Sequence, residues 1–186
     1  MKQELREFCE LLTGTFDNSA QVKELTRSGS LPADFPLARH VNTICNDHIE
    51  NLPDDFQGYF ILEESYYQLK DRTNIMPHLF LFTMEPEGIM LDSYEMPKGY
   101  TKETFCIEKL GRLDYSQLER SRAFTPVYYN KSGDTYTGHS VSMFSPTLRF
   151  TLTEQVSPDV LSVSEIFEAN GRRTFGYDIP IEYRRS

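Results

Sequence analysis

Two hydrophobic patterns divide the chain, a helical one near the N-terminus and an alternating one from His40 onward. Apolar residues recur at helical spacing in residues 5–12 and again, more briefly, in residues 21–25. We expect Gly14 to end the first helix and Asn18-Ser19 to begin the second. Because neither helix is long enough to form a core, we expect both to plug or flank a larger unit.

Beyond His40 the period changes to two, which is typical of strands. A short strand is also expected around Phe105-Cys106-Ile107, and a loop over residues 70–77. A last alternating run from Phe175 to Tyr183 contains Pro180, which indicates an edge or a bulge. The other runs predicted as strands are residues 40–45, 59–67, 78–84, 89–95, 127–129, 135–137, 148–152 and 160–168.

Turn signals of hairpin size separate most of these strands. The clearest are Glu85-Pro86-Glu87-Gly88, residues 130–134 and Asn170-Gly171. Since helices do not alternate with the strands, the sheet should be antiparallel and should close to remove its edges. We therefore predict a mainly β, single-domain fold over residues 1–186. It would be an antiparallel barrel of about eight to ten strands over residues 40–186, with short helices in residues 1–30 and room for one small ligand.

The stretch of residues 59–67 places two adjacent carboxylates in the middle of a strand. Successive side chains point to opposite faces, so Glu63 and Glu64 cannot face the same way. One interpretation turns one of them inward beside aromatic rings. The alternative is a strand that runs out toward solvent with both glutamates near its wet end, because ionised carboxylates are rarely buried without a partner.

Composition narrows the classes of partner. The 186 residues include 13 Phe and 11 Tyr and carry a net charge of -9. This charge argues against nucleic acid or an anionic membrane as a partner. Cys9, Cys45 and Cys106 are widely spaced and odd in number, which argues against a disulfide framework or structural zinc. We expect a reduced, cytoplasmic protein without a membrane segment, and a homodimer is compatible with the sequence.

Motifs for common catalytic, metal and cofactor sites are missing from the sequence, so we expect no metal and no cofactor. Glu63 with Asp92 is the candidate acid pair, if the fold brings the two together. A ligand pocket is the better hypothesis, since aromatic walls with a few convergent polar groups suit one. Its candidate ligand-binding residues are Tyr66, His78, Tyr94 and Tyr136; the alternative for each tyrosine is core packing.

Five segments, taken in order along the chain, match the markers of one protein family. The first is Thr13-Gly14-Thr15-Phe16-Asp17-Asn18-Ser19-Ala20-Gln21. The next two are His40-Val41-Asn42-Thr43-Ile44 and Phe60-Ile61-Leu62-Glu63-Glu64-Ser65-Tyr66. Asp92-Ser93-Tyr94 and Phe175-Gly176 match later markers loosely. In order and spacing these segments resemble the CpeT/CpcT family of phycobiliprotein chromophore lyases.

The resemblance implies a lipocalin-like barrel that binds an open-chain tetrapyrrole, a phycobilin. It also implies attachment of the bilin to a cysteine of a phycobiliprotein subunit, by addition of the thiolate to the ethylidene group. Glu63, with Asp92 second, would favour the protonated bilin. Where the family carries arginines, this chain has His78-Leu79-Phe80-Leu81. Two other hypotheses therefore stay open: a barrel that binds or carries a small hydrophobic ligand without catalysis, and an interaction protein with a filled interior.

Overall fold

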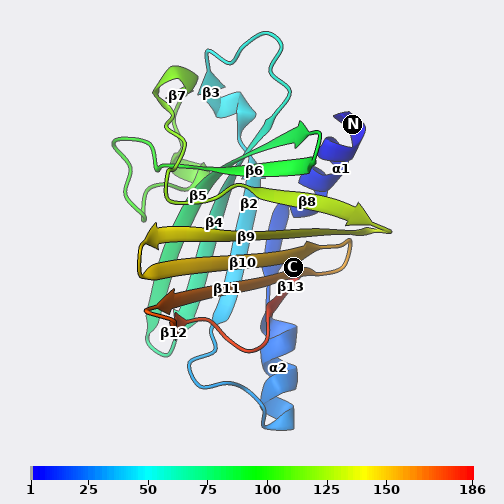
Figure 1. The fold of residues 1–186 in the computed structure, drawn as a ribbon, viewed down its shortest axis with the longest axis vertical. Coiled ribbons are helices and arrows are strands. Elements are labelled where there is room, and N and C mark those ends of the chain that lie inside the picture. The colour runs from blue at the N-terminus through cyan, green and yellow to red at the C-terminus, as the bar shows by residue number, and fades with distance from the viewer. Residues whose placement is uncertain (1) are drawn as a thin grey trace.

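The computed structural model describes residues 2–186, and its alternating segments form one antiparallel sheet of 11 strands (Figure 1). A separate pair, β3 and β7, is parallel. The strands are β1 (Gly14–Asp17), β2 (Leu37–Ile44), β3 (Ile49–Glu50), β4 (Tyr59–Leu69), β5 (Arg72–Glu85), β6 (Gly88–Tyr94), β7 (Leu113–Asp114), β8 (Val127–Ser132), β9 (Thr135–Ser145), β10 (Leu148–Val156), β11 (Leu161–Ala169), β12 (Arg172–Phe175) and β13 (Ile181–Arg185).

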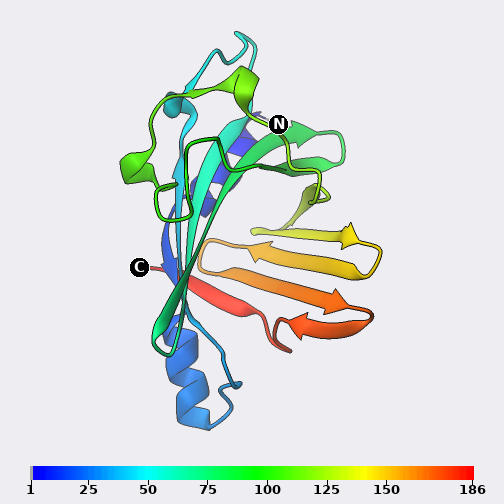
Figure 2. The same cartoon turned by 90° about the vertical axis from the view of Figure 1, so that its left-hand side faces the viewer.

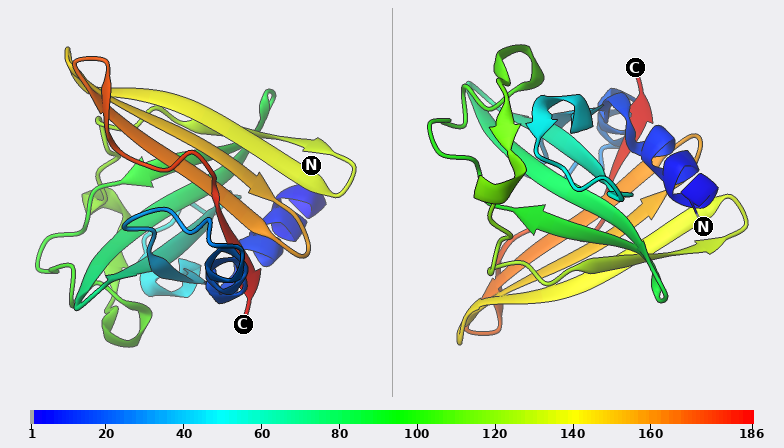
Figure 3. Two further views of the ribbon diagram at one scale, coloured as in Figure 1. Left: turned by 90° about the horizontal axis from the view of Figure 1, so that it is seen from below. Right: turned by 90° about the horizontal axis from the view of Figure 1, so that it is seen from above.

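Ten of these strands close into a barrel, as predicted from the alternation and the hairpin turns. Around the ring the order is β10, β9, β8, β6, β5, β4, β2, β1, β13 and β11, and β11 pairs back to β10. The short strand β12 continues along the β13 side of β11. Figure 3 shows the barrel from below and from above, with β9 to β11 on one side and β4 to β6 on the other. Closure leaves few unpaired edges, which is the usual way in which a meander of this size protects itself.

Helix α1 (Lys2–Leu12) packs against one end of the barrel, as its apolar spacing predicted. Phe8 is fully buried there, and its ring lies 4.9 Å from the rings of both Tyr129 and Tyr136 and 5.5 Å from that of Phe82. Leu12, one turn further on, reaches the barrel interior. The helix therefore plugs this end with one aromatic anchor.

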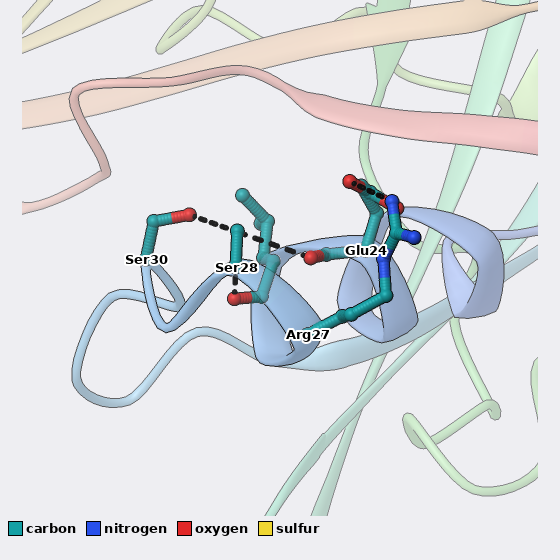
Figure 4. Close-up of polar contacts among 5 residues, drawn as sticks. Glu24, Arg27, Ser28 and Ser30 are labelled. Atoms are coloured by element: carbon teal, nitrogen blue, oxygen red, sulfur yellow. Dashed lines mark hydrogen bonds and ion pairs between the residues drawn. The ribbon is translucent and has the colours of Figure 1, made fainter.

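Helix α2 (Ser19–Ser28) flanks the barrel beside β13 and β2. Asn18 precedes it but does not cap it. Its amide instead donates to the carbonyl of Pro36 and accepts from the amide of Ala38, which ties the helix start to β2. At the other end Gly29 has a φ of 69°, and the Arg27–Glu24 ion pair and the Ser28 hydroxyl hold the last turn (Figure 4). None of the helices within residues 2–186 is long and apolar enough to cross a membrane.

The barrel wall separates two hydrophobic clusters. One fills the plugged end of the interior. The other lies outside, where residues 45–58 and 95–126 cover β4, β5 and β6 and bury apolar side chains from those strands. The opposite wall, β8 to β11, has no such cover (Figure 2), and Tyr128, Val141 and Met143 on it are exposed. One half of the wall is thus buried on both faces, and the other half only on the inside.

Two segments differ from the sequence-based prediction, the first because of a tight hairpin and the second because of this outer cover. The loop expected over residues 70–77 is wrong, since β5 begins at Arg72 after a two-residue turn. The polar residues of this segment pair with β4 but lie beyond the end of β6, which pairs with β5 only over residues 79–85. Pro77, which has no N–H to donate, therefore stands where β5 has a neighbouring strand on one side only. The strand expected around Phe105 is wrong too. Phe105 is buried against the outer face of the barrel, next to a 3-10 turn at Ile107–Lys109.

Two further differences concern the strands that close the barrel. Gly14 does not cap a helix; it begins β1 with a φ of 132° and pairs with Asn42 of β2. The single strand expected from Phe175 to Tyr183 is broken into β12 and β13 by residues 176–180, which include Pro180. The Asn170-Gly171 hairpin is confirmed, with φ values of 51° and 74°.

Candidate ligand-binding site in the barrel

Strand β4 sends one of its two adjacent glutamates to each side of the wall. Glu63 lines a cavity inside the barrel, on the same face as Ile61 and Tyr67. Glu64 lies on the outer face, where it accepts hydrogen bonds from the Tyr66 hydroxyl at 2.7 Å and from the Ile107 amide at 3.0 Å. The inward interpretation is therefore confirmed, and the protein's own donors satisfy the outer carboxylate.

The cavity inside the barrel has a volume of about 70 Å³ and a partly open mouth. That volume holds only a few water-sized groups. Its apolar walls come from strands all around the ring and from Leu12 of α1. The walls include six aromatic side chains: Tyr67, Phe80, Phe82, Phe124, Tyr129 and Phe150. Such a surface suits a small, flat, largely apolar molecule.

Five carboxyl and imidazole side chains face this apolar space: His40, Glu63, His78, Glu154 and Glu165. They come from β2, β4, β5, β10 and β11, so only barrel closure brings them together. Glu63 pairs with Asn42 on one side and with His78 on the other, which sets three polar side chains in one row across neighbouring strands. A buried group of this kind is typical of a functional site.

Glu63 and His40 form the charged pair of the cavity. Their side chains are 16% and 4% exposed, and His40 Nδ1 lies 3.5 Å from Glu63 Oε2. The Ser65 hydroxyl donates to Glu63 at 2.9 Å. Burial acts to raise the pKa of Glu63, but the charge of the neighbouring His40 outweighs it and the pKa is lowered to about 2. Burial likewise acts to lower the pKa of His40, and Glu63 raises it overall. Glu63 is therefore an anion at neutral pH.

Two neighbours fix the His40 ring from its other side. Its Nε2 lies 3.3 Å from the Tyr67 hydroxyl, and its ring centroid lies 4.2 Å from that of Tyr183. By contrast, the pKa of His78 is lowered, mainly by burial. The two histidines thus differ in the form that their surroundings favour: the protonated form for His40 and the neutral form for His78.

Glu154 and Glu165 lie on the neighbouring strands β10 and β11, on the wall across from Glu63. Burial, together with the charge on Glu63, raises the pKa of each to about 7. The Tyr129 hydroxyl donates to Glu154 and acts in the opposite direction. Glu63 and these two acids therefore titrate in different pH ranges inside one cavity, an arrangement in which one acid can hold charge while another holds a proton.

Gly138 makes the contact between Tyr129 and Glu154 possible. It lies between them on β9, paired with both residues. A Cβ atom at this position would come within 2.6 Å of the Tyr129 ring and 2.7 Å of Val127. Only a glycine leaves room for the ring to lie flat over the strand and point its hydroxyl at β10.

Of the six residues predicted for the site, the structure brings two together in the cavity, Glu63 and His78. Asp92 faces the outside of the wall and forms an ion pair with Arg120 at 3.0 Å, and Arg120 also contacts Tyr94. Tyr66 is on the outer face as well, bonded to Glu64. The candidate acid pair of Glu63 and Asp92 is thus divided by the barrel wall.

Tyr136 points inward but lies at the plugged end against Phe8, in the core-packing role named as the alternative. Its hydroxyl is buried without a hydrogen-bond partner among residues 2–186. A ligand-binding role for Tyr66, Tyr94, Tyr136 or Asp92 stays a prediction, and the site in the cavity does not use it.

Sequence reasoning missed His40, Asn42, Glu154 and Glu165. The signal was present in the alternation. Glu154 continues the apolar series of Phe150 and Leu152 at a spacing of two, and Glu165 continues that of Leu161 and Val163. His40 and Asn42 follow Ala38 in the same way. A polar residue that falls on the inward face of an otherwise apolar series marks this cavity.

The described residues hold no group of three or more His, Cys, Asp or Glu side chains placed to bind a metal ion. The three cysteines are free, and burial raises the pKa of Cys9 and of Cys45 to about 12, which leaves these two as unreactive thiols. Comparison of the sequence with models of known protein families, and with curated proteins, gave no match.

Proposed function

We propose that this protein binds an open-chain tetrapyrrole, or a similar conjugated nitrogen heterocycle, inside its barrel. The observation that carries the proposal is the buried, ionised carboxylate of Glu63 at an aromatic-walled cavity. Among residues 2–186, the Ser65 hydroxyl donates to this carboxylate and His40 lies 3.5 Å from it. A protonated pyrrole nitrogen offers a second counter-charge, and flat rings fit the aromatic walls.

The placement of the segments that resemble the CpeT/CpcT family supports this ligand. His40-Val41-Asn42-Thr43-Ile44 and Phe60-Ile61-Leu62-Glu63-Glu64-Ser65-Tyr66 form the adjacent strands β2 and β4, paired along their whole common length. Together they supply His40, Asn42 and Glu63 to the cavity. A tetrapyrrole is larger than the cavity, so its entry requires aromatic side chains such as Phe124 and Phe150 to move aside.

The second candidate function, a chromophore lyase, adds a chemical step to the same site. A cysteine thiolate of a phycobiliprotein subunit would add to the ethylidene carbon of the bound bilin. A C–S bond forms, and the ring system takes up one proton. Glu63 would keep the bilin protonated and so more electrophilic, and the barrel would limit side reactions. The resemblance supports this step, and the geometry of the cavity supports the binding.

An absorption titration with phycocyanobilin, biliverdin and haem tests the binding. We expect a saturable red shift and sharpening with an open-chain bilin. Glu63→Gln should weaken binding or move the band to that of the unprotonated form, whereas Glu87→Gln, an exposed turn position, should not. No spectral change with any of the three compounds would refute tetrapyrrole binding. Thioether formation after addition of acceptor subunits would separate the lyase from a carrier.

A further inference from the structure

The cavity contains an orphaned hydrogen-bond acceptor. Asn42 is buried, with 3% of the residue exposed, and its Nδ2 donates to the carbonyl of Leu12 at 3.0 Å. Its Oδ1 therefore points the other way, and it has no partner within the described part of the chain. Buried acceptors nearly always accept a hydrogen bond. Because residues 2–186 supply no donor to this oxygen, we expect the donor to come from a bound molecule.

Acidic side chains in the cavity also outnumber basic ones, three glutamates against two histidines. Among residues 2–186, no lysine or arginine lines it, and the one histidine with a raised pKa, His40, is paired with Glu63. Glu154 and Glu165 have no cationic side chain of their own. The titratable groups that face them from the surrounding strands are His40, Glu63, Tyr67, His78, Tyr129 and Tyr183.

We propose that the barrel selects a ligand whose polar end is a cationic N–H donor, an ammonium or amidinium group, and that this group displaces a proton from Glu154 or Glu165. The inference rests on the proposed small-molecule binding and names the class of ligand. Asn42 Oδ1 accepts one N–H of the ligand, and the ionised acid provides the counter-charge. A ligand that buries a carboxylate in this part of the cavity is excluded, because two acids already face it.

Proton displacement follows from the state of the two acids. Burial raises the pKa of each to about 7, so below neutral pH they hold protons that an unburied glutamate would have lost. An adjacent cation stabilises the ionised form and lowers these pKa values again. Binding therefore releases a proton, and below the raised pKa the affinity should fall by about tenfold per pH unit for each proton released.

Calorimetric titration with three matched compounds tests this selection: phenethylamine, 2-phenylethanol and 3-phenylpropionate. We expect the amine to bind at least about tenfold more tightly than the alcohol, and the carboxylate not to bind. Repeating the amine titration near pH 6, where both acids are mostly protonated, in phosphate and in MES, which differ in ionisation enthalpy, should show release of about one proton. The combined variant Glu154→Gln with Glu165→Gln should lose the preference for the amine and the proton release, yet keep its affinity for the alcohol. Glu87→Gln should behave like the parent.

Equal affinity for amine and alcohol, or binding of the carboxylate, would overturn the cation selection and leave a barrel that binds small molecules. Proton release that persists in the combined variant would also overturn it. Failure of all three compounds to bind would do the same. The bilin absorption titration then decides separately whether the proposed tetrapyrrole binding stands.

Discussion

Replacing Glu154 by glutamine should flatten the dependence of stability on pH. Burial raises the pKa of Glu154 from an ordinary 4.5 to about 7. The folded state therefore binds a proton that the unfolded state gives up. The resulting stabilisation is fully present below pH 4.5 and is lost as the pH rises through 7.

The magnitude follows from the size of the pKa shift. A shift from 4.5 to 7 is worth about 3 kcal/mol. We expect about 2 kcal/mol of this stabilisation to be lost between about pH 5 and pH 8, because the side chain is only partly buried. Glutamine has nearly the same shape and can still accept from the Tyr129 hydroxyl, but it cannot ionise. From about pH 5 to pH 8, the free energy of unfolding of the variant should therefore fall by about 2 kcal/mol less than that of the parent.

Urea unfolding near pH 5 and near pH 8, followed by circular dichroism and tyrosine fluorescence, measures this difference. The histidines are the same in both proteins, so most of their contribution cancels. Glu165→Gln should give a similar result, since the pKa of Glu165 is also raised to about 7. Glu87→Gln, in the exposed β5–β6 turn, controls for the loss of one charge. A Glu154→Gln variant with the same pH dependence as the parent would refute the assignment of a buried, protonated acid.

Three further substitutions test the packing that holds the site. Phe8→Ala should lower the free energy of unfolding by about 3 to 5 kcal/mol, since it removes the anchor of the plug; a loss below about 1 kcal/mol in urea unfolding would show that α1 does not close the barrel. Gly138→Ala should cost about 1 to 3 kcal/mol and change tyrosine near-ultraviolet dichroism, because the new methyl group displaces Tyr129; an unchanged spectrum contradicts that contact. Asn18→Ala should cost about 2 to 3 kcal/mol by orphaning two buried backbone groups, and thermal unfolding that matches the parent would contradict the tie to β2.

The barrel could be predicted because the residues that determine its strands and turns lie close together in the sequence. The alternation in β4 and the Asn170-Gly171 turn each specify their own geometry, and closure follows from the number of hairpins. The same alternation correctly separated Glu63 from Glu64. These features depend on residues close in sequence, so the sequence alone was enough to find them.

The outer cover could not be predicted, because it depends on contacts between distant segments. Phe105 looked like part of a strand since it is apolar, but its burial comes from the outer face of β4 to β6. Asp92 looked like a partner for Glu63 since both are acids on strands. It lies on the other side of the wall, because its position on β6 is one residue out of phase with Leu91 and Ser93, which line the cavity. The grouping of Glu63, Glu154 and Glu165 likewise exists only after the ring closes.

The unequal cover of the wall has a consequence for how the barrel opens. Backbone amides in strands packed on both faces are released only with the whole structure, whereas strands packed on one face can detach at lower cost. Native-state hydrogen exchange should therefore be slowest in β4 and β5 and faster in β9 and β10. Glu154 is on one of these weaker strands. We therefore expect a molecule larger than the cavity to enter on this side of the barrel, where β10 carries Glu154 and β11 carries Glu165.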